Sequence, residues 1–130
     1  MPHLTIEYSA NLDGRTDIGA LCNELHRAML ETGYFELGAV RVRAVRCADY
    51  AVADRMAENA FIDMSLRIGE RPDRPAEGIK AAGDSIFAAA SGFLSPLFET
   101  PHFALSFEIR RIDPELSWKK NSMHARLRNT

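Results

Sequence analysis

The most distinctive reactive group of this chain is the proline that follows the initiator methionine, Pro2. Aminopeptidases remove an initiator methionine that precedes a small residue, which would leave Pro2 with a free secondary amine. A free α-amino group has a pKa of about 7.7–8.0, and nearby cations and partial desolvation lower that pKa because they disfavour the ammonium form. A neutral amine accepts a proton, so Pro2 is a candidate general base. The structural alternative is that Pro2 only begins an edge strand.

Three arginines stand where they could hold a carboxylate beside such a base. Arg41 lies in the alternating segment AVRVR, and Arg71 lies in the loop segment GERPD, just before a predicted helix. Arg15 occupies a matching segment, DGRTD, in the first half of the chain. Guanidinium groups at strand ends and helix starts suit bidentate binding of carboxylates. The alternative for each arginine is a solvated charge that balances the 18 acidic residues.

The sequence carries no other motif for catalysis or cofactor binding. It has no glycine-rich phosphate loop, no HExxH and no CxxC, and no Ser-His-Asp order stands out. Cys22 and Cys47 match no metal-ligand spacing and no disulfide framework, so both are expected to be free thiols.

The composition is that of one small globular domain. The chain has 130 residues, of which 46% are hydrophobic and 26% charged, enough for a single core. Its formal net charge of −2 argues against a nucleic-acid partner, which requires an excess of Lys and Arg. No apolar run approaches the roughly 20 residues that span a bilayer, and the N-terminus lacks a signal segment. These features predict a cytoplasmic protein without a membrane partner.

Hydropathy in the first half predicts a strand, a helix and a second strand. Residues 3–8 alternate between apolar and polar side chains, as a half-buried strand does. Thr16 and Asp17 are good capping residues before an apolar stripe at helical spacing, and Gly33 is a plausible helix end. Residues 40–47 alternate again and form the second predicted strand.

The second half repeats that order. Residues 62–68 alternate as a strand, and a helix is predicted to begin at about Pro75, a favoured first helical position. Pro96 should kink or end this helix. Residues 103–110 then alternate as the last strand.

The chain therefore reads as one domain with two βαβ halves, about 2–48 and 60–112, and a tail, 113–130. Helical crossovers make the two strands of each half parallel. We predict an α/β (α+β) fold with one four-stranded sheet and both helices on one face. The other face is mixed in polarity and is expected to meet another subunit. The polar tail, with the only tryptophan, Trp118, is expected to reach a neighbour.

Several segments together resemble the 5-carboxymethyl-2-hydroxymuconate isomerases of the tautomerase superfamily. They are the N-terminal MPH, IEYS after it, VRVRAVR in the second predicted strand, ALSFEI in the last strand, and NSMHA in the tail. The resemblance covers nearly the whole chain. It implies a duplicated βαβ fold assembled as a homotrimer, and a cofactor-free isomerisation of a ring-cleavage product of homoprotocatechuate that carries several carboxylates.

The resemblance also implies roles for individual residues. Pro2 would be the base that moves a proton from the 2-hydroxyl of the substrate to carbon. Arg41 would bind a carboxylate or polarise the 2-oxygen, and Arg71 would hold a distal carboxylate. Glu70 stands where the family has a glycine, and Arg74 follows three residues after Arg71. The two loop arginines could therefore exchange roles.

Three alternatives remain beside this interpretation. One is a tautomerase-fold enzyme that acts on another unsaturated carboxylic acid. Another is a non-catalytic trimeric binding module, which retention of Met1 would favour, since an amide nitrogen at Pro2 is no base. A ferredoxin-like RNA-binding domain is disfavoured by the acidic balance and by the lack of an aromatic-rich basic strand. The sequence leaves open the exact substrate and the stereochemistry of proton delivery.

Overall fold

The order of strands and helices follows the duplicated pattern in a computed structural model, which describes residues 1–73 and 75–129. The strands and helices, in chain order, are β1 (His3–Ser9), α1 (Ile18–Glu31), β2 (Arg41–Cys47), β3 (Ala60–Gly69), α2 (Ala76–Phe93), β4 (Phe103–Ile112) and α3 (Met123–Arg128). Four short 3-10 turns connect them: η1 (Ala10–Leu12), η2 (Leu37–Ala39), η3 (Ser95–Glu99) and η4 (Pro114–Leu116).

The four strands form one mixed sheet in the order β2-β1-β3-β4. The strands within each half are parallel, as predicted, and the halves meet where β1 runs antiparallel to β3. His3 therefore pairs with Arg67, so that the start of β1 lies beside the end of β3. This register brings the N-terminus next to the loop that leads into α2.

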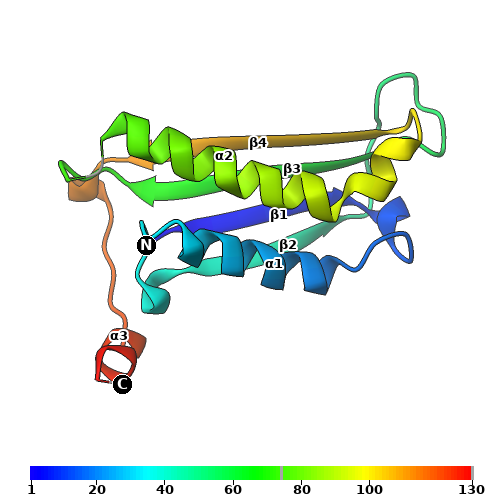
Figure 1. Cartoon of the computed structure of the whole chain (residues 1–130). Coiled ribbons are helices and arrows are strands. Elements are labelled where there is room, and N and C mark those ends of the chain that lie inside the picture. Colours follow the sequence, from blue (N-terminus) through cyan, green and yellow to red (C-terminus); the bar gives the residue numbers. More distant parts are fainter. Residues whose placement is uncertain (74, 130) are drawn as a thin grey trace.

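Both long helices cover the same face of this sheet (Figure 1), which confirms the predicted layering. The alternation in the strands is the cause, because it turns one row of apolar side chains from every strand towards the helices. Leu4 and Ile6 of β1 and Ile62 and Leu66 of β3 are completely buried there. The core is therefore a single layer between one sheet face and two helices.

The helix ends follow from the local residues, with one correction. The carboxylate of Asp17 accepts the backbone N–H of Ala20 and caps α1, and Gly33 has the positive φ of 74° that a residue after a helix often takes. The prediction that Pro75 is the first helical residue is wrong. Its ψ of 151° is extended, so Pro75 is the N-cap and α2 begins one residue later. Pro96 lies in η3, just beyond the end of α2.

The second face of the sheet carries polar and charged side chains. At one end of this face, residues that pair across neighbouring strands form a row of basic side chains: Arg41, His3, Arg67 and Arg110. No described helix covers this face, and its mixed polarity is the feature that the alternation in the sequence predicted.

The tail contains a helix that hydropathy did not predict. Helix α3 packs against η2, and the side-chain amide of Asn121 donates to the carbonyl of Gly38 at 2.8 Å. Between β4 and this anchor lie η4 and then residues 117–121, which form neither helix nor strand, and Leu116 and Trp118 are 72% and 86% exposed. Within the described ranges, no helix is long and apolar enough to cross a membrane.

Candidate functional site

Pro2 is buried at the edge of a cavity of about 430 Å³. Its carbonyl accepts the backbone N–H of Arg41 at 3.1 Å, which fixes the residue to the start of β2. The cavity lies where β1 begins, where β3 ends at Gly69, and where the chain leaves α1 at Gly33. The other residues that line it are Met1, Tyr34, Phe35, Glu36, Ala39, Glu70, Arg71, Pro114, Lys119, His124 and Arg128. The predicted base thus stands in a hollow, not on a flat surface.

The predicted loop arginine lines the same cavity. The guanidinium of Arg71 forms a bidentate ion pair with Asp73, with distances of 2.7 and 3.0 Å. The Arg71 side chain is 56% exposed, so a carboxylate ligand could replace Asp73 at little cost, because exposed ion pairs are weak. Arg74, the alternative loop arginine, lies outside the described residues.

Met1 lines this cavity and also an adjoining hollow of about 350 Å³ that the tail forms. Lys119, His124 and Arg128 border both hollows as well. Removal of Met1 would therefore leave the Pro2 nitrogen facing this shared space. The geometry is suited to a free N-terminal amine that a small molecule reaches.

Arg41, the second predicted arginine, does not line the Pro2 cavity. Its guanidinium donates to the carbonyls of Gly38 at 2.9 Å and Val40 at 3.3 Å. Because Arg41 pairs with His3, its side chain lies on the uncovered face of the sheet. The structure thus places Pro2 and Arg71 in the lining of one cavity, whereas Arg41 contacts Pro2 through its backbone and its side chain lies outside that lining.

His3 marks the electrostatic character of that uncovered face. Its Nδ1 lies 3.0 Å from Nη1 of Arg43. Partial burial, followed by the charges of Arg67 and Arg43, lowers the pKa of His3 from 6.5 to about 4. His3 is thus neutral at pH 7, and the positive potential beside it comes from arginines.

Three functional candidates in the tail escaped sequence reasoning. Nε and Nη2 of Arg128 donate to the carboxylate of Glu36 at 2.5 and 2.8 Å, and Nδ1 of His124 lies 2.7 Å from the same carboxylate. The hydrogen bonds from Arg128 are the main cause of the lowered pKa of Glu36. Lys119 completes this wall of the cavity. The only feature of the sequence in this region that stood out was the NSMHA segment, which contributed to the family resemblance but indicated no functional role for any residue.

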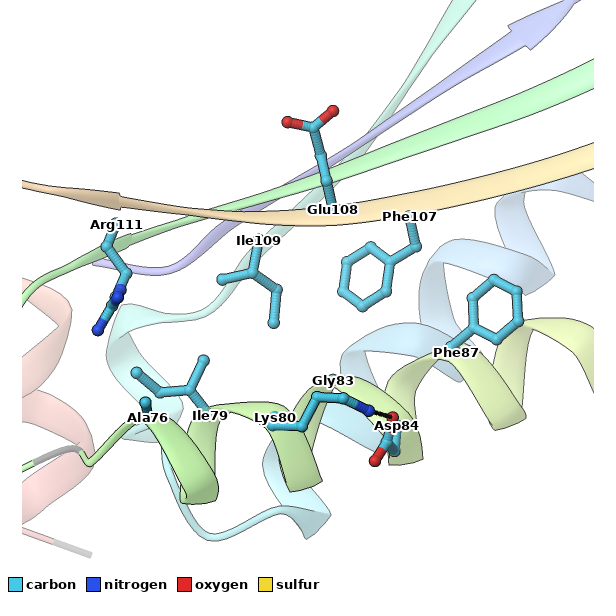
Figure 2. A pocket seen from close by; sticks show the side chains of 10 residues that line it. All are labelled: Ala76, Ile79, Lys80, Gly83, Asp84, Phe87, Phe107, Glu108, Ile109 and Arg111. Atoms are coloured by element: carbon cyan, nitrogen blue, oxygen red, sulfur yellow. Dashed lines mark hydrogen bonds and ion pairs between the residues drawn. The ribbon is translucent and has the colours of Figure 1, made fainter.

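Another hollow, of about 460 Å³, lies between α2 and β4 on the helix side of the sheet (Figure 2). Phe107 and Ile109 point into it from β4, and Phe87 faces it from α2. Four charged residues also line it, of which Lys80 and Asp84 are 2.6 Å apart and neutralise each other; the others are Glu108 and Arg111. The lining of this groove is mainly apolar and its Asp84 carboxylate is already paired with Lys80, so the Pro2 cavity is the better candidate for chemistry.

The side chains of the described ranges form no metal site. No group of three or more His, Cys, Asp or Glu residues gathers among residues 1–73 and 75–129. The thiols of Cys22 and Cys47 are free and half-buried, and burial raises the pKa of the Cys22 thiol. Neither cysteine lines the Pro2 cavity.

Comparison with known proteins identifies a family for nearly the entire chain. Residues 2–127 match the family model described as 5-carboxymethyl-2-hydroxymuconate isomerase. The chain is 32% identical over 125 residues to the 5-carboxymethyl-2-hydroxymuconate Delta-isomerase of Escherichia coli, which covers 96% of this chain and 98% of that protein.

Solved structures agree with this match. A 5-carboxymethyl-2-hydroxymuconate isomerase from Deinococcus radiodurans R1 is 36% identical, with a TM-score of 0.89 over 97% of this chain and 93% of the other. At 14% identity, a fused 4-OT symmetric trimer superposes with a TM-score of 0.60 over 87% of this chain and 88% of that one, which shows a shared fold. The fold is therefore that of the tautomerase superfamily.

Proposed function

Because the chain belongs to the 5-carboxymethyl-2-hydroxymuconate isomerase family and is an isomerase, we propose that it moves a proton in a 2-hydroxymuconate with Pro2 as the base. The observation that carries this proposal is the position of Pro2, the second residue of the chain, in a cavity that also holds Arg71. The proposed substrate is a 5-carboxymethyl-2-hydroxymuconate, a product of aromatic ring cleavage with several carboxylates.

The chemistry requires only a base, orientation and charge. With Met1 removed, the neutral amine of Pro2 takes the proton of the 2-hydroxyl, and the electrons of that O–H bond form the carbonyl. The C=C bond then shifts, and the Pro2 ammonium returns the proton to carbon. No electrons enter or leave the substrate, so the reaction needs no redox cofactor. A cation near the 2-oxygen stabilises the negative charge that develops there in the transition state.

The two predicted arginines take different places in this scheme. Arg71 holds a distal carboxylate of the substrate after it exchanges Asp73 for that ligand. Arg41 stays a proposed carboxylate ligand, and its position on the uncovered sheet face supports a site that a neighbouring subunit completes. Arg74 remains the alternative to Arg71 in the loop.

The proposed assembly is a homotrimer that uses the uncovered sheet face and the tail. Support comes from the polar rows on that face and from the exposed side chains of Leu116 and Trp118. The distant relative that superposes on this chain is described as a symmetric trimer. Light scattering at micromolar concentration tests the proposal, and a monomer would contradict it. The cytoplasmic location expected from the sequence stays a prediction.

The proposed role of Pro2 is tested by blocking its nitrogen. Three forms are compared on a 2-hydroxymuconate substrate: the processed protein, Pro2→Ala, and a form that keeps one residue ahead of Pro2, each verified by mass spectrometry. The processed form should turn over with a rate that rises with pH as the amine loses its proton. Pro2→Ala keeps a primary amine and should retain weak activity.

The blocked form has only an amide nitrogen and should be inactive. If it turns over as fast as the processed protein, Pro2 is not the base. If no form acts on the muconate but the processed form isomerises another unsaturated acid, the alternative substrate class applies.

A further inference from the structure

The cations that line the Pro2 cavity differ in whether a carboxylate already neutralises them. Arg71 is paired with Asp73, and Arg128 is paired with Glu36. The remaining acidic residue of the lining, Glu70, lies 3.7 Å from Arg111. Lys119 forms no ion pair and no side-chain hydrogen bond with the residues that the structure describes. Its ammonium is therefore the uncompensated charge of this lining.

The position of that ammonium is defined by the tail around it. Nζ of Lys119 lies 3.8 Å from the place where a Cβ on Gly69 would be, at the end of β3. Two residues later, Asn121 donates to the carbonyl of Gly38, and further along Arg128 binds Glu36. These contacts hold the tail against the mouth of the cavity, so Lys119 faces both the Pro2 hollow and the adjoining one.

We propose that Lys119 binds one carboxylate of the substrate and makes the site selective for dicarboxylates over monocarboxylates. This inference rests on the proposed function, because it assigns a ligand to the cavity that holds the proposed base. A flexible ammonium with three donors serves as a point charge for a carboxylate. The other cations of the wall must first give up a carboxylate of the protein, whereas Lys119 gives up only water.

Two ligands with the same six-carbon diene chain separate this role from general binding. Muconate has a carboxylate at both ends, and sorbate has a carboxylate at one end and a methyl group at the other. The dissociation constants of both are measured by calorimetry for the processed wild-type protein, Lys119→Met, Lys119→Arg and Lys120→Met. Lys120 is the matched control, since it is exposed and lines neither the Pro2 cavity nor the adjoining hollow.

The wild type should bind muconate about five- to tenfold more tightly than sorbate, which corresponds to about 1–1.4 kcal/mol. Lys119→Met should weaken muconate more than sorbate, whose one carboxylate can still pair with Arg71, and should so lose most of this preference. Lys119→Arg should keep the preference, and Lys120→Met should leave it unchanged. Added salt should weaken muconate binding to the wild type more than to Lys119→Met, because Lys119 is exposed and salt screens exposed charges.

The proposal is overturned if Lys119→Met weakens both ligands equally, if Lys120→Met has the same effect, or if the wild type shows no preference for muconate. Turnover of a 2-hydroxymuconate is measured separately. A wild type that prefers muconate in a Lys119-dependent way but does not isomerise the hydroxymuconate contradicts the proposed function and leaves the Lys119 site standing.

Discussion

Two glycines of α2 should respond with opposite signs to the same substitution. A Cβ added to Gly78 would lie 1.4 Å from Oη and 2.4 Å from Cζ of Tyr34, which lies in the segment that follows α1. A Cβ added to Gly92, near the other end of α2, would meet no atom within 4 Å. Gly78 thus provides the space in which the Tyr34 ring lies against the helix.

The expected free energies follow from two opposing effects. Alanine is favoured over glycine in a helix interior by roughly 0.5–1 kcal/mol, with less gain near the helix ends where both residues lie. Gly92→Ala should therefore stabilise the protein by about 0.5 kcal/mol. Forcing extra atoms into a packed contact costs about 1–3 kcal/mol, which exceeds that gain. Gly78→Ala should destabilise the protein by about 0.5–2.5 kcal/mol.

The assay is urea unfolding at one fixed protomer concentration, because an oligomer's stability depends on concentration. Gly78→Ala is also placed in a Tyr34→Ala background, where the overlap is gone and the substitution should become neutral or stabilising. Since Tyr34 lines the Pro2 cavity, the single variant Gly78→Ala should also change KM. A Gly78→Ala protein as stable as the wild type, or one equally destabilised in both backgrounds, would refute the packing argument.

Three further outcomes are expected. Arg41→Ala should lower kcat/KM for a tricarboxylate by about 1.5–3 kcal/mol in transition-state binding, whereas Arg15→Ala should be mild; equal losses would show that the two arginines are equivalent. The pKa of His3 is lowered from 6.5 to about 4. Between these two pH values the folded state binds fewer protons than the unfolded state, so the free energy of unfolding should fall as pH drops from about 6.5 to 4. His3→Gln should flatten that slope in urea titrations, and an unchanged slope would exclude His3 as its source. Glu36→Gln weakens the anchor of α3 and should speed amide hydrogen exchange in residues 123–128, whereas exchange as slow as in the wild type would show that other contacts hold the helix.

Sequence reasoning was most successful where periodicity alone decides the structure. The alternation in residues 3–8 and 62–68 fixes which side chains are buried, and the register of β1 with β3 follows from that burial. Helix α3 was missed because its six residues are too short for a helical period to show. It is stabilised by contacts with distant residues, such as that of Asn121 with Gly38, and no local pattern encodes those.

The site was predictable only in part, for the same reason. Pro2 and Arg71 stood out by residue type and position, and both line one cavity. The alternation already placed the Arg41 side chain on the face opposite Val42, but the sequence did not show which face of the sheet borders the cavity. Lys119 lies more than a hundred residues from Pro2 in the chain, so only the folded tail reveals that they share a hollow.

The duplication of the fold explains why the proposed chemistry belongs at one end of the sheet. The two halves give two similar corners, one where β1 begins after Pro2 and one where β3 begins after Asn59. Asn59 is 7% exposed, and its side chain is engaged by Val52, Asp54 and His102. At that corner the chain continues, so its backbone nitrogen is an amide and cannot act as a base. Arg15, which matches Arg71 in the sequence pattern, lies near this second corner, where its guanidinium is 3.5 Å from the carbonyl of Glu58. The repeat thus supplies an arginine loop twice, but only a chain terminus supplies an amine, and the chain has one N-terminus.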